Sequence, residues 1–104
     1  MLAIIQEADG LAKGGKRVAA AEVLEGRGAA AVRRAEDDAT ALAPKSDWGK
    51  ARRTDLLGLA KDRDRDIKSY AAALRKGDEM AMLEALTHEI ETDKKAEALE
   101  QALK

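Results

Sequence analysis

The sequence predicts an all-α protein, and three of its features support that prediction. Ala, Leu, Lys, Arg and Glu are abundant, there is a single proline, and few stretches show the alternation of β-branched residues that strands need. Apolar residues recur at spacings of three and four, as they do on one face of a helix. The predicted architecture is an antiparallel up-and-down helical bundle with one short N-terminal helix and three long helices. We expect residues 1–104 to form a single domain.

The N-terminal half is predicted to hold two helices of unequal length. The first covers about 2–13 and ends at Gly14-Gly15, because paired glycines are typical of a helix C-cap and turn. The second covers about 16–42. Glycines near 26–28 each destabilise a helix interior by roughly 1 kcal/mol relative to alanine, so we expect a kink or a break there.

The C-terminal half is predicted to hold the two longest helices. Pro44 disfavours helix at the residue before it, so the third helix begins after this loop, with Ser46 or Asp47 as N-cap, and covers 47–76. Gly77 supplies a left-handed C-cap, and the fourth helix covers 78–103. Short connections make neighbouring helices antiparallel. Because the first helix is short, the bundle should have four helices at one end and three at the other.

A run of six charges, 61–66, interrupts the apolar stripe of the third helix. Ala60 and Ile67 lie seven residues apart on one helix face, so the run removes a single core layer. Counting outward from the Pro44 loop places Gly28 opposite Arg63. A glycine there leaves room for the aliphatic stem of the arginine to lie across the helix while its charged head reaches water. The run also has oppositely charged pairs at helical spacing, typical of a solvated face. The predicted polar layer comprises Gly28, Arg63 and Asp64.

The fourth helix should pack on the third through its large apolar residues. Counting outward from Gly77 places Met80 opposite Leu74 and Leu83 opposite Tyr70. The apolar positions of the first part of this helix are Met80, Leu83, Leu86 and Ile90.

Composition excludes several classes of function. A net charge of −1 argues against a dedicated nucleic-acid-binding protein, and no apolar segment approaches the roughly 18 residues of a membrane helix, so no membrane insertion is expected. Cysteine is absent, which removes disulfides and thiolate chemistry. Localisation stays open between the cytoplasm and a mature exported domain that lacks its signal peptide.

The sequence shows no convergent set of catalytic groups, so we expect neither an enzyme nor a cofactor. His88 is the only histidine, and Glu84 lies one turn before it. These two residues are weak candidates for a metal site, because a dinuclear carboxylate bundle needs Glu-x-x-His on two helices. A surface histidine is the favoured interpretation.

The sequence therefore predicts a non-enzymatic helical protein-interaction or structural module, with a small-ligand or metal-binding bundle as the alternative. Because the first helix is short, we expect an open groove between the second and fourth helices at the far end of the bundle. Either a second copy of the chain or a helical partner would fill it. The other interpretation is that three helices close on themselves. The predicted lining is Val32, Ala39, Leu99 and Leu103.

Overall fold

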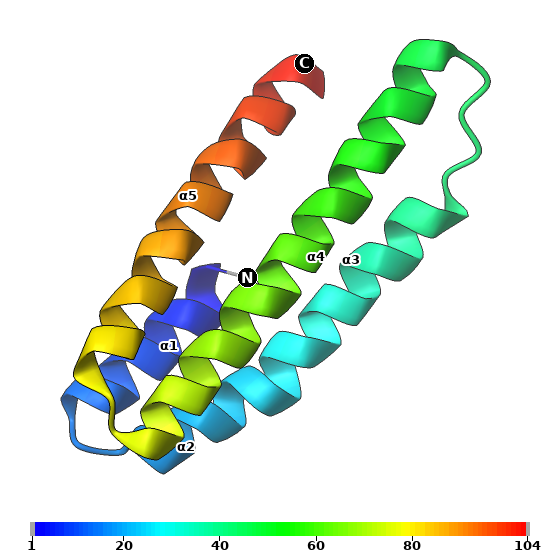
Figure 1. The fold of residues 1–104 in the computed structure, drawn as a ribbon. Helices are drawn as coiled ribbons and strands as arrows, with labels where there is room; N and C mark the ends of the chain where they lie inside the picture. Colours follow the sequence, from blue (N-terminus) through cyan, green and yellow to red (C-terminus); the bar gives the residue numbers. More distant parts are fainter. Residues whose placement is uncertain (1, 104) are drawn as a thin grey trace.

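Residues 2–103 are described by the structure, a computed structural model, and they form helices joined by short connections (Figure 1). The elements are α1 (Leu2–Lys13), α2 (Arg17–Val23), the π-helical turn η1 (Leu24–Gly28), α3 (Ala29–Ala41), α4 (Asp47–Lys76) and α5 (Glu79–Leu103). The predicted all-α bundle is confirmed, and each helical segment agrees with its expected bounds to within one residue.

The second helical segment is continuous, so the irregularity expected near 26–28 is a π-helical turn and not a break. In η1 the backbone N–H of Ala29 points back five residues to the carbonyl of Leu24. Such a turn accommodates one extra residue without ending the helix. Gly28 is buried at the end of this turn, while Gly26 is exposed to solvent.

Helix α4 is the centre of the arrangement, with α3 packed along one side and α5 along the other (Figure 1). The short α1 packs against α2 and η1 beside the half of the bundle that holds the α4–α5 turn. That half is four helices thick, whereas α3, α4 and α5 alone form the other. The molecule is elongated, about 49 Å by 21 Å by 18 Å.

Local capping interactions set the ends of the long helices. The Ser46 side chain accepts a hydrogen bond from the N–H of Gly49 (3.0 Å) at the start of α4. Gly77 ends α4 in the left-handed conformation (φ 69°), and the Asp78 carboxylate accepts from the N–H of Ala81 (3.1 Å) as α5 begins. These interactions are the ones that Ser, Gly and Asp make at helix ends.

The predicted pairing of α3 with α4 is wrong by one helical turn. Gly28 faces Ile67 rather than Arg63, and a Cβ atom on Gly28 would lie 3.4 Å from the Ile67 Cδ1 atom. The cause is the extended loop at 42–46. It continues along the bundle past the end of α3, so α4 begins beyond that end (Figure 1). Ala60 and Ile67 are both buried on one face, as expected.

None of the helices within 2–103 has a segment both long and apolar enough to span a membrane.

The close approach of Gly28 to Ile67 gives a test of this packing. Gly28→Leu should lower the free energy of unfolding by about 1–3 kcal/mol, because the added side chain overpacks the core. Gly26→Leu is the matched control in the same turn, since nothing lies within 4 Å of a Cβ atom there. Chemical denaturation should show no loss of stability for Gly26→Leu. Equal effects of the two changes would contradict the packing described here.

Candidate functional site

Helix α5 is rotated about its axis relative to the expected orientation. Its most buried residues are Ala85, Glu89 and Thr92, which lie one above another at helical spacing. The residues expected inside, by contrast, include Met80, Leu83 and Ile90, which are 70%, 60% and 57% exposed. Only Leu86 of the expected set packs against the core. The predicted pairing of α5 with α4 is therefore wrong.

The reason for this rotation is a buried polar cluster between α4 and α5. The Arg63 guanidinium contacts the carboxylates of Glu89 (2.9 Å) and Asp93 (3.1 Å). The Thr92 hydroxyl donates a hydrogen bond of 2.6 Å to Asp66, which also accepts from exposed Arg65. A buried charge is costly unless it is paired, so α5 must turn its own polar side chains toward α4.

This cluster replaces the predicted polar layer. Arg63 belongs to it, but Gly28 faces Ile67, and Asp64 lies at the helix surface in an ion pair with Lys68 (2.8 Å). The charged run is thus solvated only in part. Sequence reasoning missed the cluster residues Asp66, Glu89, Thr92 and Asp93.

Glu89 is the most perturbed group of the cluster. Its side chain is only 6% exposed, and its Oε2 atom has no hydrogen-bond partner among the described residues. Burial, followed by the negative charge of Asp93, raises the pKa of Glu89 to about 7, against the opposing effect of Arg63. Near neutral pH this carboxyl group is therefore close to half protonated.

The outer face of α5 carries an exposed strip, which we call the α5 strip and define as Met80, Leu83, Thr87 and Ile90. Spacings of three, four and three residues place these side chains in one line along the helix, on the side opposite Ala85. The next position in that line is Lys94, where the apolar strip ends. Large apolar side chains gathered on one exposed face commonly mark an interaction site.

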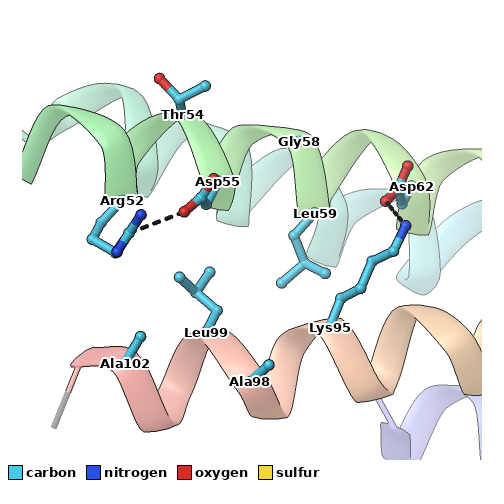
Figure 2. Close-up of a pocket in the computed structure, with 10 residues that line it drawn as sticks. All are labelled: Arg52, Thr54, Asp55, Gly58, Leu59, Asp62, Lys95, Ala98, Leu99 and Ala102. Atoms are coloured by element: carbon cyan, nitrogen blue, oxygen red, sulfur yellow. Dashed lines mark hydrogen bonds and ion pairs between the residues drawn. The ribbon is translucent and has the colours of Figure 1, made fainter. Parts of the chain in front are cut away.

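A second apolar feature is a groove of about 560 Å³ between the first half of α4 and the last half of α5 (Figure 2). Leu59 and Leu99 point toward each other across it. An ion pair between Asp62 and Lys95 (3.3 Å) lies at one end of the groove, and Asp62 directly precedes Arg63 of the polar cluster in the sequence.

The expected groove between the second and fourth helices has a different location and lining. Val32 and Ala39 are 2% and 4% exposed and belong to the interior, whereas Leu99 lines the groove between α4 and α5. The side chain of Leu103 lies outside the described part of the structure. Because α4 runs between α3 and α5, residues of those two helices face α4 rather than a groove that they share.

His88 and Glu84 are both exposed on α5. Across the described chain, no group of three or more His, Cys, Asp or Glu side chains is arranged to hold a metal ion.

Comparisons with protein-family models, with curated proteins and with solved structures found no match to this chain.

The raised pKa of Glu89 predicts a specific pH dependence of stability. The unfolded chain releases this proton near the ordinary pKa of 4.5, whereas the folded chain releases it near pH 7. The contribution of Glu89 to the free energy of unfolding is therefore full below about pH 4.5 and declines as the pH rises to about 7. The free energy of unfolding should fall by on the order of 3 kcal/mol across this pH range. Glu89→Gln keeps an acceptor for Arg63 and stays neutral, so above about pH 7 it should be more stable than the natural protein.

Denaturation with urea at about pH 5 and pH 8 measures this difference. Glu84→Gln, the same substitution at an exposed position of α5, is the control and should show no such change. If the gap between Glu89→Gln and the natural protein is the same at both pH values, Glu89 does not titrate between them.

Proposed function

We propose that this protein is a non-enzymatic helical interaction module that binds an amphipathic helix of a partner protein on the α5 strip. The observation that carries the proposal is the orientation of α5. This helix places alanine and polar groups inside, while Met80, Leu83 and Ile90 face solvent. Covering one such side chain is worth roughly 1.5–3 kcal/mol, a gain that the fold itself leaves largely unused.

The spacing of the strip supports a helix as the occupant. Met80, Leu83, Thr87 and Ile90 stand at the a, d, a and d positions of two heptads. At that spacing the side chains of two helices interlock along their length. A strip of two heptads is smaller than a standard protein interface, so we expect binding in the micromolar range.

The buried titratable groups support a non-enzymatic role. Glu89 lies inside the α4–α5 contact, and burial together with Asp9 raises the pKa of Tyr70 to about 12. Tyr70 is buried and donates its hydroxyl to Asp9 (3.5 Å), which joins α4 to α1. Both perturbed groups thus have structural partners, whereas a catalytic group has to face a substrate.

A neutral helical peptide tests this docking. The probe has about 21 residues, with leucine at the a and d positions and glutamine and alanine elsewhere. The double variant Leu83→Gln/Ile90→Gln should bind it at least about tenfold more weakly, because it removes two apolar anchors. Its melting temperature should not change, since both side chains are exposed.

Fluorescence anisotropy of the labelled peptide measures the affinity. Trp48→Gln is the control, because Trp48 is another exposed apolar side chain but lies at the start of α4, away from the strip. The proposal is wrong if the natural protein does not bind the peptide, or if Trp48→Gln weakens binding as much as the double variant does.

The groove between α4 and α5 favours a second candidate function, the binding of a small apolar ligand. Its volume of about 560 Å³ lies in the usual range for such sites, and Leu59 and Leu99 form apolar walls. Ala98→Trp should fill the groove and abolish the fluorescence of bound anilinonaphthalene sulfonate. If Leu83→Gln/Ile90→Gln abolishes that signal instead, the dye binds to the α5 strip and the groove is not its site.

A further inference from the structure

The charge around the α5 strip indicates which kind of helix it accepts. Residues 77–93 contain six acidic residues and neither lysine nor arginine. Of these acids, Glu89 and Asp93 face Arg63 inside the fold. Glu84 and Glu91 are exposed and lie seven residues apart, so they share one edge of the strip, at the e positions of its heptads.

Positive side chains lie near the two ends of the strip and beneath it: Lys94 is exposed where the apolar line ends, whereas Arg17 and Arg65 pair with residues of the fold. Arg17 contacts Glu79 at 3.5 Å, at the very start of the strip. Arg65 interacts electrostatically with Glu91 without forming an ion pair with it. The ion pairs of Arg65 are with Asp66 (3.1 Å) and Asp62 (3.7 Å). Within residues 2–103, no ion pair involves Glu84 or Glu91. Ahead of Lys94, the edge of the strip that carries Glu84 and Glu91 therefore presents negative charge to an incoming helix.

We propose that the partner is a basic amphipathic helix, with lysine or arginine beside its apolar face. This inference rests on the proposed function. Lysine or arginine flanking an apolar seam would meet Glu84 and Glu91 across the contact, and such pairs set partner choice where two helices pack. A second copy of this chain is disfavoured as occupant, because it would bring the same glutamates to the contact and place like charges together. Acidic edges likewise disfavour an anionic bilayer.

Two peptides that differ only in charge test this proposal. Both keep the apolar seam of the neutral probe, and one carries lysine and the other glutamate at the flanking e and g positions. The natural protein should bind the lysine peptide about tenfold more tightly than the glutamate peptide at about 50 mM salt. Raising the salt to about 300 mM should reduce this ratio severalfold, since exposed charges are screened.

The charge-reversed variant Glu84→Lys/Glu91→Lys is the matched control. It leaves the apolar strip intact, so it should bind the neutral peptide as before and now prefer the glutamate peptide. Equal affinity of the natural protein for both charged peptides overturns the proposed partner but leaves helix docking intact. Failure to bind any of the three peptides overturns the proposed function as well.

Two further results would also overturn the basic partner. One is a dimer of the natural protein in sedimentation that Leu83→Gln/Ile90→Gln dissociates, which would make a second copy the occupant. The other is binding to phosphatidylglycerol-containing vesicles that the same double variant abolishes, which would make a bilayer the occupant.

Discussion

The arginine at position 63 constrains the rest of this structure. It lies in the middle of the longest helix, where that helix contacts α5, and its charge needs partners because burying it alone would cost several kcal/mol. Helix α5 supplies Glu89 and Asp93 within 3.1 Å of Arg63, and Thr92 bonds to neighbouring Asp66. A helix turns as one body, so bringing this polar face inward carries Leu83 and Ile90 outward. The same interaction therefore sets both the core and the exposed surface.

The elements of the fold could be predicted because the signals that define them are local. Gly77 adopts the left-handed conformation, and Ser46 caps the first turn of α4, through atoms only a few residues away in the chain. The contact of Gly28 with Ile67 could not be predicted in the same way. It depends on how far the 42–46 loop rises before α4 begins, which no short-range pattern specifies.

The candidate site could not be predicted, because two faces of α5 competed for the interior. Apolar periodicity favours the face with Met80, Leu83 and Ile90, since larger side chains gain more from burial. The observed face has smaller Ala85 and polar Glu89 instead, because pairing of the charges on α4 outweighs that gain. One sequence signal did indicate the face of α5 that packs inward: Arg63 and Asp66 are spaced by three residues, as are Glu89 and Thr92. Both pairs therefore form polar patches of one helical turn that can meet.

On the inner face of α5, the acidic character of residues 77–93 follows from the contact with α4. The inner acids need no basic residue on their own helix, because Arg63 reaches them from α4. The inner face of α5 thus takes its positive charge from another helix, α4. The outer acids Glu84 and Glu91 have no ion pair within the described chain, and the same holds for exposed Glu22 and Glu97, whereas Glu25 pairs with Arg75 (2.7 Å). Under the proposal of a basic partner helix, Glu84 and Glu91 would take their positive charge from outside the fold.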